Sequence, residues 1–469
     1  MKFKLLSIFA LILLLLTSNF YLLNAQQFSA TKTLVQRQQD FIDLRFGMFI
    51  HYNIPTYMNQ DWADPEASPA LFNPKKLDCQ QWADAAKSAN MTYGCLTTKH
   101  HSGFAICNTK TTAYNVMNSP LKRDVVKEYA DAFRAKGLKV MLYYSILDTH
   151  HKLRPNSING GHIKMIKDQI TELLSNYGEI DALIIDGWDA PWSRISYDDV
   201  PFEEIYTLIK TLQPNCLVMD LNAAKYPAEA LYYTDIKSYE QNAGQHISTD
   251  KNKLPALSCL PLQATWFWKE NSPQEVLKDV SKLVNDNIIR MNNASCNFIL
   301  NVAPNKDGLI DANALTALKE IGKLWKNEGP LTKLPVFDAP IISSNLAKKQ
   351  VSNSSWSDDM DIMDFANDDN FNSSWVSNPT VRTPWYEITF DNTKPLNMIV
   401  IAEKVENIKN YKLEYSINGI WKSIFNGTNT NKIKVHRFDG VWADKVRITV
   451  EQSTKKAQIT EFGIYNERK

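Results

Sequence analysis

Short apolar runs alternate with longer amphipathic segments through about the first two thirds of the chain, and this alternation limits the fold more than any other feature. The apolar runs are FGMFIHY (46–52), YGCLTTK (93–99), KVMLYYSI (139–146), DALIIDG (181–187), CLVMDLN (216–222), LYYTDI (231–236), ATWFW (264–268) and CNFILNV (296–302). Segments with helical periodicity, such as RDVVKEYADAFRAKG (123–137) and FEEIYTLIKTL (202–212), separate several of them. Apolar strands that alternate with helices are typical of a parallel sheet covered on both faces. Eight such strands favour a (β/α)8 barrel over an open doubly wound sheet.

The pattern changes near residue 335. Beyond it there is no long helical segment, and short alternating runs such as WYEITFD (385–391) and KVRITVE (445–451) are separated by polar turns such as Asn418-Gly419. This pattern predicts an antiparallel β-sandwich. We therefore expect a β/α-barrel domain over residues 26–335 and a β-sandwich domain over residues 336–469.

The first 25 residues have the features of a secretory signal peptide. Two lysines precede an apolar run that ends at Leu16, and Ala25 supplies a small residue at the expected cleavage site. An uncleaved anchor is the alternative, because Phe20 to Leu23 lengthen the apolar stretch. No later segment is long and apolar enough to span a bilayer. We expect an exported protein, periplasmic or secreted, that leaves the membrane once the signal is cleaved.

Charge and motif spacing exclude several classes of function. The formal net charge is +1 without basic tracts, which argues against nucleic acid as the main partner. No GxGxxG or GxxxxGK loop follows an apolar run, so the usual nucleotide sites are not expected. The six cysteines lack CxxC or CxH spacing, which argues against a zinc site built on them.

Carboxylates, histidines and aromatic residues gather where the predicted strands end, and a β/α barrel has its active site at that edge. These residues include His51, His100, His101, Asp186, Glu240 and Trp266. Aromatic rings stack on the apolar face of a pyranose, histidines and carboxylates bind its hydroxyls, and two carboxylates cleave the glycosidic bond. The set predicts a sugar-cleaving site. The alternative for Asp186 is a carboxylate that only caps the following loop or helix.

The adjacent pair His100 and His101 allows three interpretations. With His51, His150 or His151 it could bind a metal ion, it could be an ordinary pair of loop residues, or it could clamp a polar ligand. Neighbouring side chains on a strand point to opposite faces, which argues against the metal unless the strand ends there. The polar-ligand clamp is the interpretation that we favour from the residues.

Five blocks of sequence carry a resemblance to a known family. They are RFGMFIHYNIPTY (45–57), TTKHHSGFAIC (97–107), KRDVVKEYADAFRAKGLKVMLYYS (122–145), IDALIIDGW (180–188) and FILNVAPNKDGLID (298–311). Together they resemble glycoside hydrolase family 29, the α-L-fucosidases, over about residues 40–327. The resemblance implies a retaining mechanism on a β/α barrel, a fucosylated glycan or oligosaccharide as substrate, no cofactor and no metal.

The resemblance also implies roles for individual residues. Asp186, in the family's Asp-Gly position, would be the nucleophile, and Tyr144 would lie near it. The implied sugar contacts are His51, Asp61, Trp62, His100 and His101, with Trp266 over the apolar side of the fucose. The histidine pair would then be a sugar clamp.

Three positions depart from the family pattern. Ile184 stands where the family often has Trp, and Asp61 is shorter than the usual Glu. In one branch the acid/base Glu precedes an aromatic pair by about nine residues, which here falls on Leu257. We therefore assign the acid/base role to Glu240, with Asp235 as the second choice.

The C-terminal part resembles a galactose-binding-like (discoidin-type) module over about residues 345–466, through motifs such as Glu461-Phe-Gly-Ile-Tyr465. Such modules often bind glycans and sometimes hold calcium, for which the turn at Asp368, Asp369 and Asn370 is the candidate. The module could equally be a packing partner only.

Two hypotheses of different class follow. The first is an exported retaining exo-α-L-fucosidase, or a glycosidase of the same fold acting on a related galacto-configured sugar. The second is a catalytically weak or inactive glycan-binding protein, suggested by Leu257 and by the appended sandwich.

Overall fold

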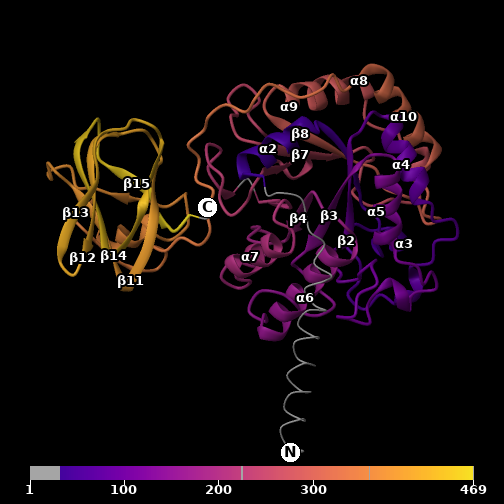
Figure 1. Ribbon diagram of the computed structural model, residues 1–469, viewed down its shortest axis with the longest axis horizontal. Helices are drawn as coiled ribbons and strands as arrows, with labels where there is room; N and C mark the ends of the chain where they lie inside the picture. The colour runs from indigo at the N-terminus through magenta and orange to yellow at the C-terminus, as the bar shows by residue number, and fades with distance from the viewer. Residues whose placement is uncertain (1–31, 223–224, 359, 468–469) are drawn as a thin grey trace, which may run out of the picture.

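A computed structural model describes residues 32–222, 225–358 and 360–467 of the chain. The predicted signal peptide and its alternative, an uncleaved anchor, therefore lie outside the described residues. Figure 1 shows a β/α barrel, coloured from indigo to orange, beside a β-sandwich coloured from orange to yellow. No helix in the described ranges is long and apolar enough to cross a membrane.

Eight parallel strands form the barrel. They are β1 (Phe46–Ile50), β2 (Tyr93–Lys99), β3 (Lys139–Ser145), β4 (Ala182–Asp186), β5 (Leu217–Asp220), β6 (Lys237–Glu240), β7 (Ala256–Pro261) and β8 (Cys296–Asn301). Their order in the sheet is β5-β4-β3-β2-β1-β8-β7-β6. A parallel bridge between Met219 and Ile236 joins the β5 edge to the segment before β6. The predicted (β/α)8 fold is confirmed.

Helices surround the barrel. They are α2 (Leu34–Asp43), α3 (Pro55–Met58), α4 (Cys79–Ser88), α5 (Val125–Ala135), α6 (Gly160–Asn176), α7 (Phe202–Leu212), α8 (Val280–Lys282), α9 (Arg290–Asn292) and α10 (Ala312–Leu324). A π-helix, η6 (Leu283–Ile289), joins α8 to α9, and 3-10 turns lie at η1 (Pro69–Leu71), η2 (Val116–Asn118), η4 (Gln241–Ala243) and η5 (Ser272–Gln274). Inward-facing side chains such as Phe49, Met141 and Ile184 fill the barrel interior. The interior is thus a packed core, and space for a ligand is left at its ends.

Two strands lie elsewhere than the sequence predicts. The sixth strand is β6 and not 231–236, and the seventh is β7 and not 264–268. Both predicted runs are rich in aromatic residues, which are common in strands. Here Tyr232 and Tyr233 pack between α7 and the sandwich, and Trp266 lies in the loop after β7. The segment PQEVLKDVSKLVNDNII (273–289) has the sequence pattern of a single helix, but the structure divides it among η5, α8 and η6.

The sandwich consists of β9 (Val351–Ser354), η7 (Met360–Ala366), β10 (Trp375–Val376), β11 (Trp385–Glu403), β12 (Ile408–Ile417), β13 (Ile420–Thr428), β14 (Ile433–Ser453) and β15 (Gln458–Tyr465). The long strands β11 and β14 pair with each other in three stretches, with a register shift between each stretch and the next. One half of β11 therefore joins β9 and the other half joins β15. This confirms the predicted antiparallel sandwich.

The calcium candidate in the sandwich is engaged in internal bonds. Asp369 pairs with Lys348 at 3.1 Å and accepts a hydrogen bond from Asn345. Asp368 accepts hydrogen bonds from Asn370 N and Ser373 Oγ. These contacts make the turn part of the packing around Glu461, which accepts a hydrogen bond from Asp369 N.

The barrel and the sandwich share an apolar contact. Met398 and Val400 of β11 belong to the same buried cluster as the outer layer of the barrel. Phe371 packs its ring 5.0 Å from Tyr232. An ion pair between Lys348 and Asp198, at 3.0 Å, lies at the same junction. The sandwich is therefore fixed to the side of the barrel.

Candidate active site

A cavity of about 260 Å³ opens at the carboxyl ends of the barrel strands. Eight residues predicted from the sequence line it, namely His51, Asp61, Trp62, His100, His101, Asp186, Glu240 and Trp266. They come from segments up to about 215 positions apart, and the parallel strands bring them together because all strands end at one edge.

Asp186 ends β4 and lies buried in the wall of this cavity. Tyr143 Oη donates to its Oδ2 at 2.6 Å, and the Gly187 amide donates to Oδ1 at 2.7 Å. Burial raises the pKa of Asp186 to about 6, against the lowering effect of these two donors. Burial also keeps the pKa of Tyr143 well above its usual value, so its hydroxyl remains a donor. The carboxylate is thus held in one orientation.

Glu240 ends β6 and faces the same cavity. The Trp266 indole Nε1 donates to its Oε1 at 3.1 Å. Burial, together with the nearby charge of Asp186, raises the pKa of Glu240 to about 7. Burial raises the pKa of both carboxyl groups, and the charge of Asp186 adds to the increase at Glu240, so Glu240 is the group that holds its proton more firmly. Such a pair, separated by its environments, can serve as nucleophile and acid.

His51 is held in one tautomer by Asn301 at the end of β8. Asn301 Oδ1 accepts from the His51 amide at 3.1 Å and from Nδ1 at 2.8 Å, while its Nδ2 donates to the Trp266 carbonyl at 2.7 Å. Nδ1 therefore carries the proton and Nε2 is an acceptor. Burial lowers the pKa of His51 to about 3, so the ring is neutral near pH 7.

His101 is also held in one tautomer, here by Ser145 at the end of β3. Ser145 Oγ donates to the Leu147 carbonyl at 2.8 Å, so it accepts from His101 Nδ1 at 2.7 Å. His101 Nε2 is left as an acceptor, 3.7 Å from Asp186 Oδ2. Burial lowers the pKa of His101 to about 3. Both histidines can accept hydrogen bonds from ligand hydroxyls.

His100 completes the pair with its ring 3.9 Å from that of His101. Burial lowers its pKa well below the usual value. Its Nδ1 is buried and has no hydrogen-bond partner within the described ranges. A buried ring nitrogen without a partner is costly, which suits a position that a ligand hydroxyl completes.

Asp61 and Trp62 approach the cavity from the loop after β1. Asp61 Oδ1 accepts from the Phe267 amide and lies 3.2 Å from Lys269 Nζ. The short carboxylate is therefore tied to the loop after β7. The Trp62 ring packs against the His101 ring with the ring centroids 4.6 Å apart and the planes tilted by 34°, and half of the Trp62 surface is exposed.

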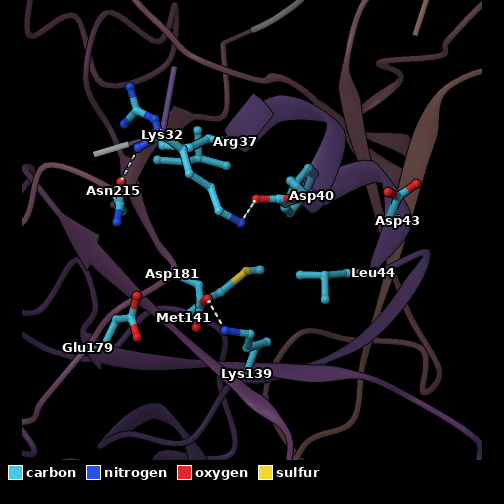
Figure 2. Close-up of a pocket in the computed structure, with 12 residues that line it drawn as sticks. Lys32, Arg37, Asp40, Asp43, Leu44, Lys139, Met141, Glu179, Asp181 and Asn215 are labelled. Atoms are coloured by element: carbon cyan, nitrogen blue, oxygen red, sulfur yellow. Dashed lines mark hydrogen bonds and ion pairs between the residues drawn. The ribbon is translucent and has the colours of Figure 1, made fainter. Parts of the chain in front are cut away.

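A second cavity, of about 480 Å³, lies at the opposite end of the barrel, where strands β3, β4 and β5 begin (Figure 2). Four of its charged groups form two ion pairs, Lys32 with Asp40 at 2.5 Å and Lys139 with Asp181 at 3.0 Å. It contains no histidine and no tryptophan. In barrels the amino ends of the strands serve stability, so the cavity around Asp186 is the candidate active site.

Metal binding is one of the interpretations that the sequence allows for the histidine pair. Within the described ranges no three His, Cys, Asp or Glu side chains are grouped as a metal ion would require. In the candidate site each of His51 and His101 has its Nδ1 engaged by a fixed partner, and the two face a carboxylate pair. This donor arrangement fits a hydroxylated ligand.

Comparison with known proteins agrees with this geometry. The family model for alpha-L-fucosidase matches residues 60–330, and the model for the F5/8 type C domain matches residues 347–462. The first match covers more than half of the chain. The chain belongs to the α-L-fucosidase family.

Curated relatives support this assignment. The chain is 24% identical over 454 residues to alpha-L-fucosidase 1 of Arabidopsis thaliana, covering 90% of this chain and 85% of the relative. It is 24% identical to tissue alpha-L-fucosidase of Homo sapiens, covering 60% of this chain and 66% of that protein. As a member of this family the protein is a glycoside hydrolase.

Solved structures agree on the fold. Alpha-L-fucosidase isoenzyme 1 from Paenibacillus thiaminolyticus superposes with a TM-score of 0.55 at 22% identity, covering 90% of this chain and all of that chain, 100%. A glycoside hydrolase 29 family member from an unknown rumen bacterium gives a TM-score of 0.52 at 24% identity, covering 94% and 78%. Both comparisons support the barrel with its appended sandwich.

One residue predicted for the site lies outside it. The prediction that Tyr144 is near Asp186 is wrong, because neighbouring residues of β3 point to opposite faces and Tyr143 is the one that points inward. Tyr144 faces the helices, where its hydroxyl donates to Gln169 at 2.7 Å.

The other acid candidates are also placed. Asp235 is bound by Lys210 at 2.7 Å and by the Tyr206 hydroxyl, near the start of β5 and away from the cavity. Leu257, where one family branch would have its Glu, is buried within β7. Only Glu240 among these positions reaches the cavity.

Sequence reasoning missed Trp192, which lines the cavity from the loop after β4. It also left Asn301 and Ser145 without a role, although both stand at strand ends. For Asn301 and Ser145, the position at the end of a strand could have indicated a role in the site. For Trp192 there was no such signal, because a tryptophan in a loop looks the same whether it faces a site or the solvent.

Proposed function

We propose that the protein is an exported, retaining exo-α-L-fucosidase that hydrolyses terminal α-L-fucosyl linkages of glycans or oligosaccharides. The observation that carries the proposal is the pair Asp186 and Glu240 in one cavity, with the pKa of Glu240 the higher of the two. Family membership supports fucose as the sugar that is released, since the curated relatives are named alpha-L-fucosidases.

In the first step the Asp186 carboxylate attacks the anomeric carbon of the fucose. The bond between that carbon and the glycosidic oxygen breaks, and Glu240 transfers its proton to the departing oxygen. The products are a fucosyl ester of Asp186 and the released alcohol. Tyr143 and the Gly187 amide keep the attacking carboxylate aimed at the sugar.

In the second step Glu240, now ionised, accepts a proton from water. The resulting hydroxide attacks the anomeric carbon, the ester bond breaks, and the Asp186 carboxylate is restored. Two inversions give net retention of configuration. The same two carboxyl groups therefore serve both steps without a cofactor.

The remaining residues bind the sugar. His51 and His101 present acceptor nitrogens to its hydroxyls, with His100 beside them. Trp266, whose ring lies 4.9 Å from that of His51, covers the apolar side and the methyl group. The cavity ends on the filled barrel interior, which suits a terminal sugar and hence exo action.

Export is proposed on the sequence alone. Residues 1–25 have the composition of a signal peptide, and the family resemblance to glycan-degrading enzymes fits a protein that meets its substrate outside the cytoplasm. Detection of a mature chain that begins after Ala25, in the periplasm or the medium of an expressing cell, supports this part. Retention in the membrane contradicts it.

The test of the activity uses purified residues 26–469 with p-nitrophenyl α-L-fucoside beside the α- and β-galactosides and the β-fucoside. We expect selective turnover of the α-L-fucoside. Turnover of a galactoside instead indicates the related galacto-configured sugar. Binding of fucosylated oligosaccharides with no hydrolysis of any substrate indicates a binding protein and overturns the proposal.

The roles of the two carboxyl groups are tested by separate variants. Asp186→Gly should abolish turnover, with azide restoring it by attacking from the vacated side. Glu240→Ala should slow substrates with poor leaving groups far more than substrates with good ones, because only the former need the proton. Equal losses on both kinds of substrate contradict the acid role of Glu240.

A further inference from the structure

Two exposed tryptophans meet at the mouth of the cavity. Trp62 is 50% exposed and Trp192 is 44% exposed, although large aromatic side chains gain free energy when they are buried. Their ring centroids lie 5.5 Å apart at an interplanar angle of 84°, so the rings form a corner. Contiguous exposed apolar surface at the rim of a site is typical of ligand contact.

The corner stands next to the reacting groups but outside them. The His101 ring lies 4.6 Å from Trp62 and 4.9 Å from Trp192, and its Nε2 is 3.7 Å from Asp186 Oδ2. A methyl group built on Gly187 would come 3.4 Å from the Trp192 ring. One layer of side chains therefore separates the corner from the nucleophile.

The loops that carry both rings are held in place. The loop with Trp192 is closed at its base by the Asp189 amide, which donates to the Ile195 carbonyl at 2.6 Å. Asp189 is itself fixed by the Tyr226 hydroxyl at 2.6 Å. On the other side Asp61, next to Trp62, accepts from the Phe267 amide. Because the rings are held before a ligand arrives, little ordering is needed on binding.

Both indole nitrogens are available. Within the described ranges neither the Trp62 nor the Trp192 N–H donates to another protein atom, whereas Trp188, Trp266 and Trp268 donate to Val200, Glu240 and Asp311. A sugar ring offers an apolar face for stacking and hydroxyl oxygens for these donors.

We propose that Trp62 and Trp192 form a subsite for the aglycone, which binds the pyranose to which the terminal fucose is attached. The proposal rests on the proposed fucosidase activity and deepens it, because it makes the enzyme selective for a sugar as the leaving group. Trp62 then contacts the second sugar, in place of the fucose contact expected from the resemblance.

The test compares two substrates in the same variants. α-L-Fucosyl fluoride has a leaving group too small to reach the corner, whereas a fucosylated oligosaccharide places a pyranose on it. For Trp192→Ala and for Trp62→Ala we expect the ratio of kcat/KM on the oligosaccharide to kcat/KM on the fluoride to fall about tenfold, as the loss of one stacking contact implies. Trp356→Ala, at a 65% exposed tryptophan of the sandwich, is the matched control and should keep the wild-type ratio.

The outcomes are separable. An unchanged ratio in Trp192→Ala overturns the subsite, whether the two kcat/KM values keep their wild-type size or fall by the same factor. Turnover of the fluoride by the wild-type protein would still support the fucosidase activity in that case. Failure of the wild-type protein to hydrolyse the fluoride overturns the fucosidase proposal and the subsite with it.

Discussion

At the residue scale, the orientation of Asp186 depends on which alternate residues of two neighbouring strands point into the barrel. Residues 141, 143 and 145 of β3 face inward together with 182, 184 and 186 of β4, because β3 and β4 pair with Tyr143 beside Ile184 and Ser145 beside Asp186. The hydroxyl of Tyr143 therefore reaches the carboxylate, and Ser145 reaches His101. Tyr144, one position later, points outward, where its hydroxyl donates to Gln169 of α6 and its ring lies under Lys99 Nζ.

This difference predicts that two matched variants differ in their pH profiles. Tyr143→Phe removes a donor that lowers the pKa of Asp186, so the acid limb of the pH profile should move to higher pH. The value of kcat/KM at the optimum should fall about 10- to 100-fold, as expected for a hydrogen bond to a charged group. Tyr144→Phe, which loses only its bond to Gln169, should leave the acid limb where it is. Equal shifts in both variants contradict the assignment.

The two carboxyl groups also predict the pH dependence of the wild-type enzyme. Asp186 must be ionised, so kcat/KM should fall as the pH drops below about 6, its pKa. Glu240 must be protonated, so kcat/KM should fall as the pH rises above about 7. In Glu240→Gln, the basic limb that the wild-type enzyme shows on a substrate with a poor leaving group, such as a fucosylated oligosaccharide, should disappear. A basic limb that persists in this variant assigns it to another group.

Much of the site could be predicted from residue identity, and the reason is physical. His51, His100 and His101 directly follow buried strands and Asp186 ends one, and the ends of parallel strands meet at one edge. Tyr144 was misplaced because the family motif names a tyrosine without saying which side of the strand it is on. In the pairing of β3 with β4, Tyr143 is on the same side as Asp186. Glu240 was harder, since β6 is a short, partly polar strand that carries little apolar signal.

At the element scale, the segment before β6 and the loop after β7 explain the errors in strand assignment. The runs 231–236 and 264–268 are aromatic because their rings cover the sandwich junction and the candidate site, not because they form strands. The true strands β6, KSYE, and β7, ALSCLP, contain no β-branched residue and only one aromatic residue between them, so they carry a weak strand signal. Aromatic content alone cannot separate a strand from a loop that packs or binds a ligand.

The contact between α10 and α4 gives a test at this scale. Gly322 lies against the Ser88 carbonyl, and a Cβ built on it would come within 1.9 Å of that oxygen. Gly322→Ala should therefore destabilise the barrel by about 1–3 kcal/mol, although alanine normally favours a helix. The measurement is the urea midpoint followed by tryptophan fluorescence.

The control for this test is Gly160→Ala at the first residue of α6. A Cβ built there has no heavy atom within 4 Å. This variant should keep or slightly raise the midpoint. A midpoint for Gly322→Ala equal to that of the wild-type protein would show that the two helices can separate without cost.

At the scale of the whole molecule, β11 links the two domains. Ile399 and Ile401 face the sandwich core, while Met398 and Val400 face the barrel. A strand buried on both faces reads as a continuous apolar run, which is what NMIVIAEK (397–404) contains. The sequence thus held a signal for this contact, but it could not tell which surface covers the second face.

The junction predicts a shared stability. Phe371→Ala removes a ring that packs on Tyr226 and Tyr232 of the barrel and should lower the temperature of thermal unfolding by about 3 °C. Phe365→Ala, at a 41% exposed phenylalanine in η7, should leave it unchanged. Scanning calorimetry makes the comparison. An unfolding temperature of Phe371→Ala equal to that of the wild-type protein would mean that the contact with the barrel adds no stability.

The account as a whole depends on Asp186 attacking the sugar directly, and the anomer released first tests this most directly. Proton NMR during the early hydrolysis of p-nitrophenyl α-L-fucoside separates the two anomers of fucose before they interconvert. Double displacement through Asp186 and Glu240 predicts that α-L-fucose appears first, with the β anomer following by mutarotation. Initial release of β-L-fucose would mean a single displacement by water and would contradict the mechanism proposed for this site.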